Sequence, residues 1–381
     1  MYKVCLRGFL AAVLLTSVAA GLPGVSGEPA VDGRTLSGYS GGLTVMTRNI
    51  YVGADVDIVL AAVDPSQVPV LAAEAFEQMI STDFPERADA LAGEISIIRP
   101  QLIGLQEVSL IRFQESGDAV MGGTEPAEEV LYNYLRILLR ALEERRLDYR
   151  VAVKVQNADV EIPMVNPDSP IGFSDVRLTD FDVILAREDV VISRKAKGHY
   201  QARLVVPGAG IEVPRGWCAV DAEFKGRSYR FVNTHLEPAS VPELVPLQMA
   251  QAQELLMLMA SAELPVILVG DLNSPAPEGE TYRFIKSQGF VDAWMRNLMW
   301  GFSRFNRKGF TSLNDPDLRN SDFKLFERID LIMVRKNMGD LREIGPVVAF
   351  VTGDEPEDRT PSGLWPSDHA GVAAKLWIPM Y

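Results

Sequence analysis

The sequence is poor in cysteine, which limits how the chain can be stabilised. It contains two cysteines in 381 residues. Cys5 precedes an apolar N-terminal run, so removal of that run would leave Cys218 alone and no intramolecular disulfide could form. Cys218 lies in a predicted strand, where a cysteine is more often a buried apolar side chain than a nucleophile.

Positive charge is also scarce. Lysine and arginine number 37 against 51 aspartates and glutamates, which gives a formal net charge of -14. Proteins that bind nucleic acid without sequence preference usually carry a basic face, because neutralising phosphates and releasing counterions drives their affinity. The acidic balance therefore disfavours a nucleic-acid partner without excluding it, since a bound divalent cation could offset the charge locally.

The first apolar run is shorter than a membrane span. Basic residues in the first seven positions precede an apolar run over residues 9–22, and Pro23 follows it. A spanning helix needs about 20 apolar residues, so a retained anchor is the less favoured alternative to a secretory signal peptide. We expect residues 1–27 to be a signal peptide cleaved between Ala20 and Ala30, and the mature chain to be secreted or periplasmic.

The remaining chain can bury a large core. Hydrophobic residues make up 47% of the sequence, and we find no repeat of fixed period. From about Thr44 onward, β-rich runs alternate with helical runs, which is typical of an α/β layered fold. One domain over residues 41–378 is the simplest interpretation. The predicted strands span 43–46, 101–105, 149–155, 182–186, 217–224, 229–234, 265–269, 328–334 and 371–377, and the predicted helices span 86–98, 128–146 and 244–260.

Two stretches, residues 114–127 and 299–324, look irregular. We interpret both as long surface loops near a functional site, with decorative insertions as the alternative. The second carries Met299, Trp300 and Phe302, the one apolar cluster that could contact a membrane, although core packing is the commoner reason for such a cluster.

Polar side chains gather just after the predicted strands, where open α/β sheets place their sites. Asn49 follows the first strand, and an asparagine there is often only a turn former. Glu107 follows residues 101–105, and a carboxylate at a buried edge needs a partner or a metal to stay ionised. His235 follows residues 229–234, where a lone histidine is most often a hydrogen-bonded structural residue.

Further carboxylates follow the later strands. Asp271 and Asn273 come after residues 265–269, and their spacing of two points both side chains to one side, although an ordinary turn would have the same pattern. Asp330 lies inside an apolar strand, so its charge needs a cation or a protonated histidine nearby.

The last cluster contains a histidine, and the chain has three in all. Asp368 and His369 precede the final strand, so two of the three histidines follow or precede strands in these clusters. His199 lies in a polar, basic stretch, and we expect it to be solvated.

The order of these clusters resembles the endonuclease/exonuclease/phosphatase superfamily, which includes pancreatic-type nucleases, abasic-site endonucleases, neutral sphingomyelinases and inositol polyphosphate 5-phosphatases. The resemblance covers roughly residues 41–378, and six motifs in the right order leave little room for chance. It implies a four-layer α/β/β/α sandwich, in which two mixed sheets lie face to face with helices outside. The motifs are Asn49, Gln106-Glu107, Thr234-His235, Gly270-Asp271-Leu272-Asn273, Arg328-Ile329-Asp330 and Ser367-Asp368-His369.

The resemblance also implies roles for these residues. Glu107 would be the principal ligand of Mg²⁺ or Mn²⁺, with Asn49 as a second ligand or a contact through water, since both ions prefer hard oxygen ligands. His369 would be the general base toward the attacking water. Asp330 would orient His369 or share a metal, and Asp368 would support the same corner.

Other roles concern the phosphate. His235 and Asn273 would donate hydrogen bonds to the phosphoryl oxygens, and Asp271 would position the water or hold a second cation. Arg215 resembles a phosphate-contacting arginine of the pancreatic-type nucleases, with a solvated strand-edge arginine as the alternative. Asp182 lies where family members often place a tyrosine or another phosphate contact, so this position departs from the family pattern.

Three hypotheses of function follow. The first is a secreted, Mg²⁺-dependent phosphodiesterase or phosphomonoesterase that acts, as a monomer, on a small molecule or lipid headgroup by in-line attack of water; export and the acidic surface favour it. The second is an extracellular nuclease, although the usual basic cleft and disulfides are missing from the sequence. The third is a binding module that lost the chemistry, but such modules normally lack the metal ligand or the base, and here Glu107 and His369 are both present.

Overall fold

The computed structural model describes residues 41–60, 62, 64–206, 211–298, 306–312, 314–324, 326–336 and 344–378. The predicted signal peptide and the apolar cluster at Met299, Trp300 and Phe302 lie outside the described residues. Within the described part of the chain, no helix has both the length and the apolar character needed to cross a membrane.

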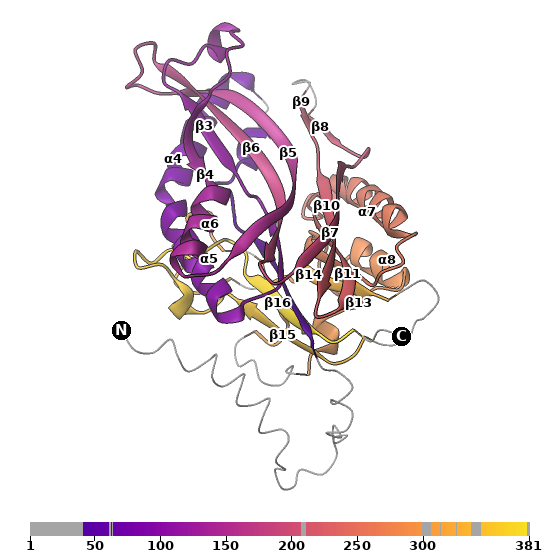
Figure 1. Cartoon of the computed structure of the whole chain (residues 1–381). Helices are drawn as coiled ribbons and strands as arrows, with labels where there is room; N and C mark the ends of the chain where they lie inside the picture. The colour runs from indigo at the N-terminus through magenta and orange to yellow at the C-terminus, as the bar shows by residue number, and fades with distance from the viewer. Residues whose placement is uncertain are drawn as a thin grey trace.

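Two β-sheets lie face to face (Figure 1). In spatial order, the larger sheet contains β15 (Val347–Thr352), β16 (Gly371–Leu376), β1 (Leu43–Asn49), β2 (Leu102–Gln106), β6 (Phe173–Arg187), β3 (Leu110–Gln114) and β4 (Glu129–Asn133), and β5 (Tyr149–Val165) also pairs with β6. The smaller sheet contains β13 (Val291–Asp292), β14 (Asp330–Arg335), β12 (Val266–Asp271), β11 (Arg227–His235), β10 (Gly216–Phe224) and β7 (Val191–His199). A separate hairpin joins β8 (Leu204–Val206) and β9 (Ile211–Val213).

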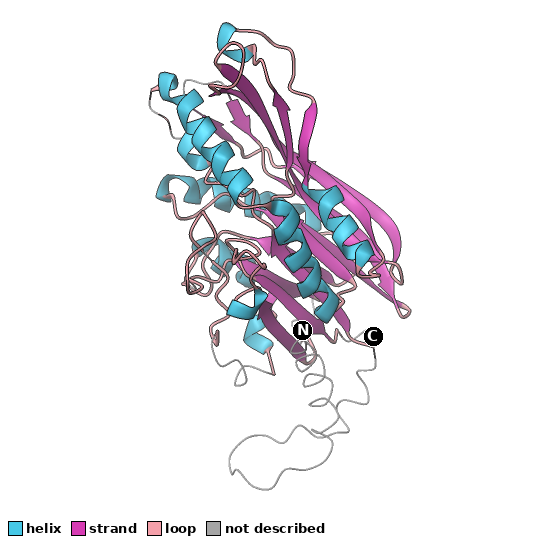
Figure 2. Cartoon of the chain, turned by 90° about the vertical axis from the view of Figure 1, so that its left-hand side faces the viewer, coloured by secondary structure: helices cyan, strands magenta, loops and turns pink. Residues whose placement is uncertain are grey.

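Helices form the two outer layers. On one side of the molecule α4 (Val68–Ser81), α5 (Phe84–Ile98) and α6 (Tyr134–Glu144) cover the larger sheet, as Figure 2 shows face on. On the other side α7 (Val245–Met259) and α8 (Glu280–Ser287) cover the smaller sheet. The predicted four-layer α/β/β/α sandwich is therefore confirmed.

The alternation of side chains along each strand divides the core into layers. In β1, Leu43 and Val45 pack between the two sheets, whereas Met46 packs against the helices outside. Because successive side chains of a strand point to opposite faces, a strand buried on both faces is mostly apolar, and its buried polar residues need partners. Cys218 lies fully buried between the sheets, as predicted.

The predicted helix over residues 128–146 is wrong at its N-terminal end. Its first residues form β4, in which Tyr132 pairs with Ile111 of β3. The helix α6 begins only after Asn133, whose side chain accepts a hydrogen bond from the backbone N–H of Arg136 at 3.0 Å and caps the helix. Pairing with a neighbouring strand thus overrides the local helical pattern.

The predicted strands are found, and two of them are longer than expected. Residues 149–155 and 182–186 are parts of β5 and β6, which pair along almost their whole length in one long hairpin. The predicted hairpin of β10 and β11 turns at Lys225 and Gly226, whose φ angles of 51° and 71° are what a two-residue turn requires.

The two irregular stretches lie in different places. The backbone N–H of Gly117 donates to the Phe173 carbonyl at 3.2 Å, so residues 114–127 cover the outer end of the β5–β6 hairpin. That end lies roughly 30 Å of strand from Asp182, so this loop is not close to the site. The second stretch does reach the site, since the backbone N–H of Asn314 donates to the Asp368 carbonyl at 2.8 Å.

A glycine lets the sheets approach closely beside the end of β2. A Cβ atom on Gly104 would lie 2.6 Å from Asn233 Oδ1 and 2.6 Å from a methyl group of Val269, both in the smaller sheet. The Asn233 side chain crosses between the sheets, because its Nδ2 donates to the Leu105 carbonyl at 2.9 Å and its Oδ1 accepts from Gln106 Nε2 at 2.6 Å. These contacts set the spacing of the two sheets at this point.

Candidate active site

The ends of several strands bring the predicted polar residues to one edge of the two sheets. In the larger sheet β1 and β2 run parallel, so Asn49 and Glu107 leave it side by side. In the smaller sheet β11 and β12 run parallel, with His235 opposite Asp271, and the antiparallel β14 begins with Asp330 opposite Asp271. The loop before β16 adds the remaining residues.

Glu107 and Asn49 form the first part of the site. Asn49 Nδ2 donates to Glu107 Oε1 at 2.7 Å, and the backbone N–H of Val52 donates to Glu107 Oε2 at 2.9 Å. The backbone N–H of Tyr51 donates to Asn49 Oδ1 at 3.0 Å. The φ angle of Glu107 is 58°, a left-handed conformation that persists in a non-glycine residue only when its surroundings hold it. Burial and the nearby Asp368 raise the pKa of Glu107 to about 7.

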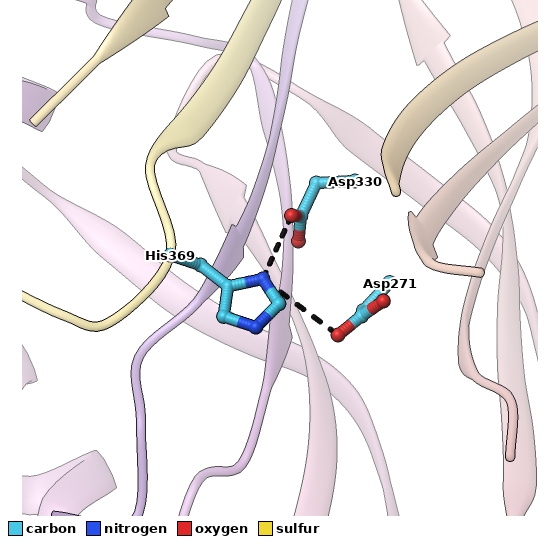
Figure 3. A group of neighbouring side chains, drawn as sticks. All are labelled: Asp271, Asp330 and His369. Atoms are coloured by element: carbon cyan, nitrogen blue, oxygen red, sulfur yellow. Dashed lines mark hydrogen bonds and ion pairs between the residues drawn. The ribbon is translucent and has the colours of Figure 1, made fainter. Parts of the chain in front are cut away.

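Asp271, Asp330 and His369 form the second part (Figure 3), and all three are buried. His369 Nδ1 lies 2.8 Å from Asp330 Oδ2 and 3.8 Å from Asp271 Oδ2. Burial alone would lower the pKa of His369, but the carboxylates of Asp330, Asp368 and Asp271 raise it well above its usual range. In the neutral imidazole Asp330 holds the proton on Nδ1, so Nε2 keeps the lone pair that can accept a proton from water.

Asp271 connects the two parts. Its Oδ2 lies 3.3 Å from Asn49 Nδ2, and its Oδ1 accepts from the backbone N–H of Asn273 at 2.9 Å. Burial and Asp330 raise its pKa to about 6. Asn273 has a φ of 49°, a conformation that asparagine tolerates better than most residues.

His235 is held in the opposite tautomer to His369. Arg215 Nη1 lies 3.1 Å from His235 Nδ1, and because an arginine can only donate, Nδ1 is the acceptor and the ring proton sits on Nε2. Burial, then Arg215 and His369, keep the pKa of His235 well below its usual range, so the ring is neutral. Glu237 Oε2 in turn accepts from Arg215 Nε at 3.3 Å.

His235 and Asn273 direct two donors to one point. Asn273 Nδ2 donates to the Leu236 carbonyl at 3.0 Å, which fixes the orientation of the amide. The same Nδ2 lies 3.1 Å from His235 Nε2, which carries the ring proton. His235 Nε2 also lies 3.5 Å from Asp271 Oδ2. Both N–H groups therefore face the site, where a phosphoryl oxygen is an acceptor that suits them.

The donor set of the site fits a hard divalent cation. The ligand atoms of Asp271, Asp330 and His369 all lie within 4.8 Å of one another. Asp330 Oδ1 is buried, and no described residue donates a hydrogen bond to it. Glu107 adds two carboxylate oxygens, the kind of ligand that Mg²⁺ and Mn²⁺ prefer. Asn49 turns its Nδ2 toward Glu107, and its Oδ1 accepts from the backbone N–H of Tyr51. When bound, such an ion offsets negative charge and polarises the phosphoryl group.

Two buried arginines that the sequence analysis did not single out hold the loops of the site. Arg87 on α5 donates to the carbonyls of Ile50 at 2.8 Å and Pro366 at 3.1 Å, so it ties the loop after β1 to the loop before β16. Arg48 on β1 donates to the carbonyl of His369. The signal available in the sequence was a basic residue inside an apolar strand or on the apolar face of a helix.

The structure places the remaining predicted residues as follows. Asp368 Oδ1 accepts from Ser367 Oγ at 3.2 Å, at the same corner as His369. Asp182 is fully buried in β6, where burial and Asp180 raise its pKa well above the usual range. His199 is exposed at the end of β7, as predicted.

Comparisons with solved structures find similar proteins of low sequence identity. A Bacteroides thetaiotaomicron protein of the endonuclease/exonuclease/phosphatase family is 17% identical, with 89% of this chain and 99% of that chain covered and a TM-score of 0.51. Truncated TDP2 of Caenorhabditis elegans is 18% identical, with 88% and 98% covered and a TM-score of 0.47. A mannosyl-6-phosphatase of Bacteroides thetaiotaomicron VPI-5482 is 16% identical, with 88% and 99% covered and a TM-score of 0.49.

The family is decided by the sequence match. A comparison with curated proteins finds no match. The model of the Endonuclease/Exonuclease/phosphatase family matches residues 78–369, which is more than half of the chain and includes Glu107, His235, Asp271 and His369. The chain therefore belongs to the endonuclease/exonuclease/phosphatase family and is a metal-dependent hydrolase of phosphoric esters.

Proposed function

We propose that the chain is an exported, Mg²⁺- or Mn²⁺-dependent phosphoesterase that hydrolyses a small phosphate ester by in-line attack of water. The observation that carries this proposal is the pair of Nδ1 partners, Asp330 for His369 and Arg215 for His235, which favour opposite tautomers of the two histidines. His369, bonded to Asp330 through Nδ1 at 2.8 Å, accepts the proton of the attacking water at Nε2. His235, bonded to Arg215 through Nδ1, presents an N–H to the phosphoryl oxygens.

Each residue then has one role in the reaction. Glu107 would hold the divalent cation, with Asn49 as a second ligand or a contact through water, and Asp330 keeps His369 in the tautomer that accepts a proton. Asn273 and His235 donate to the oxygens whose negative charge grows as phosphorus becomes five-coordinate. Arg215 fixes the tautomer of His235 and adds positive charge beside the phosphate.

The electrostatics of the site support a small substrate over a nucleic acid. Asp182, Asp271 and Asp330 are buried carboxylates within or beside the site, Glu107 is a partly buried one, and the chain carries a net charge of -14. A long polyanion gains affinity by pairing many phosphates with lysines and arginines, and Arg215 is already paired with Glu237. A single phosphate group needs one neutralised pocket, which a bound cation together with Arg215 provides.

The substrate class and the metal requirement can be tested together. We expect the purified chain to hydrolyse a chromogenic phosphodiester or the matching phosphomonoester in Mg²⁺, to lose this activity in EDTA and to regain it when Mg²⁺ or Mn²⁺ is restored. Preferential hydrolysis of the diester indicates a phosphodiesterase, and preferential hydrolysis of the monoester indicates a phosphatase. Turnover of DNA or RNA at a higher kcat/KM than both esters would favour the nuclease instead, and activity that survives EDTA would contradict a metal-dependent reaction.

Export rests on the sequence of the first 27 residues, in which a basic start precedes a short apolar run. We expect the protein recovered from outside the cytoplasm to begin between Ala20 and Ala30. N-terminal sequencing of that material measures the cleavage site. Recovery of the intact N-terminus in the membrane fraction would show a retained anchor.

A further inference from the structure

Beside the site just described, β5 and β6 bring together three oxygen-bearing side chains. Asp180 and Asp182 are two residues apart on β6, so they share one face of the strand. That face is turned toward the smaller sheet, because Ile184, the next residue in the alternation, packs in the core between the sheets. Asn157 of β5 lies where the pairing register shifts, and its Nδ2 donates to Asp180 Oδ2 at 2.9 Å.

Several oxygen atoms of this cluster lack the partners that burial demands. Asp182 is 0% exposed, and neither of its carboxylate oxygens meets a donor of a described residue at full hydrogen-bond geometry. Burial and Asp180 raise its pKa, and the nearby Asn157 side chain offsets this only in part. Asn157 is 4% exposed, and its Oδ1 also has no hydrogen-bond partner among those residues. A buried carboxylate without a partner is costly, so native structures normally pair it or place a cation beside it.

The surrounding residues do not supply enough positive charge to balance these carboxylates. The carboxylates of Glu237, Asp180, Asp182 and Glu107 all act on the single guanidinium of Arg215. Glu237 already accepts from Arg215 Nε at 3.3 Å. One positive charge shared among four carboxylates leaves a surplus of negative charge beside the site.

We propose that Asp180, Asp182 and Asn157 form a second divalent-cation site, separate from the site at Glu107 and Asn49. The oxygen atoms on offer are the two of Asp182, one of Asp180 and the amide oxygen of Asn157, a set of hard ligands that suits Mg²⁺, Mn²⁺ or Ca²⁺. Asp180 is partly exposed, which leaves room for water molecules to complete the coordination. The ion offsets the surplus negative charge of Asp180 and Asp182 near Arg215.

Counting bound ions tests this site without any substrate. Equilibrium dialysis of the full chain against Mn²⁺ at pH 8 gives the number of ions per chain. We expect Asp182→Asn to bind one ion fewer than the wild type, Glu107→Ala also one fewer, and the double variant two fewer. Asp159→Asn is the matched control, since Asp159 lies on the same strand as Asn157 but is paired with Arg177 at 2.7 Å, and its ion count should equal that of the wild type.

Unfolding temperatures distinguish loss of the ion site from loss of folding. In EDTA, Asp182→Asn removes a buried unpaired charge and should unfold at or above the wild-type temperature. Added Mn²⁺ should raise the unfolding temperature of Glu107→Ala, but not that of the double variant. If Asp182→Asn unfolds early, Asp180→Asn replaces it in both measurements.

The outcomes separate this site from the proposed function. If Asp182→Asn binds as many ions as the wild type, the second site is refuted and Asp182 is a neutral, protonated carboxyl. If the chain hydrolyses no phosphate ester but Glu107→Ala still binds an ion that Asp182→Asn removes, the site stands and the proposed function fails.

Discussion

Replacing Glu107 with alanine is expected to lower kcat/KM by at least ~10²-fold, because a bound metal supplies several kcal/mol of charge stabilisation in the transition state. Both oxygens of Glu107 are positioned by donors, Asn49 Nδ2 at 2.7 Å and the backbone N–H of Val52 at 2.9 Å. The carboxylate is therefore preorganised. Steady-state kinetics in saturating Mg²⁺ measures the loss.

The matched control for Glu107 is Glu144→Ala. Glu144 is an exposed glutamate paired with Arg140 on α6, and its removal should leave activity unchanged. Because burial and Asp368 raise the pKa of Glu107 to about 7, protons compete with the ion below that pH. The Mn²⁺ affinity of the wild type should therefore weaken as the pH falls from 8 to 6. Normal turnover by Glu107→Ala would remove Glu107 from the metal site.

Replacing His369 with alanine is expected to lower kcat by ~10² to 10⁴-fold with little change in KM, the usual effect of losing a general base. The phosphate contacts through His235, Arg215 and Asn273 remain, so substrate binding should persist. Separate measurement of kcat and KM distinguishes this result from a loss of folding, which lowers the active fraction and the unfolding temperature. His199→Ala is the matched control, since His199 is an exposed histidine that should not affect turnover.

The pH profile gives an independent test of the same assignment. A general base works in its deprotonated form, so activity is lost as the pH falls through the pKa of His369. Burial lowers the pKa of His369, but the carboxylates of Asp330, Asp368 and Asp271 raise it by more than burial lowers it. The fall in activity on the acid side of the pH profile, the acid limb, should therefore lie above the ordinary histidine pKa of about 6.5. Asp330→Asn removes the strongest of the raising charges and should move the limb to lower pH. An unchanged limb in this variant would mean that another group titrates.

The sequence indicated which polar residues the fold brings together more accurately than it indicated the local structure around them. Glu107 and Asp271 lie at the carboxyl ends of the parallel strands β2 and β12, which meet at one edge of a sheet, whereas His369 lies at the same edge because it precedes the antiparallel β16. Glu129–Asn133 was assigned to a helix because its apolar residues also fit a helical period, and only pairing with β3 decides for a strand. Such pairing joins residues far apart in the chain and leaves no local pattern.

The supporting residues were missed for a related reason. Arg48 and Arg87 act on backbone carbonyls, which every residue has, so no motif marks their partners. Glu237 acts on His235 through Arg215, and such an indirect contact is visible only once the strands are placed together. Asp182 was found by its position in the family pattern, but the missing partners of its oxygens appear only in three dimensions.

Glu107 follows a strand of the larger sheet, whereas His235 and Asp271 belong to the smaller sheet. The distance between the two sheets therefore sets the distance between the two halves of the site. Gly104 and Asn233 act as a spacer of fixed width there. Side chains that pack between the sheets far from the site therefore help to set the distance between Glu107 on one side and His235 and Asp271 on the other. A substitution that changes the volume of an inward-facing side chain in one sheet would therefore need a compensating change in the facing sheet if the two halves of the site are to keep their spacing.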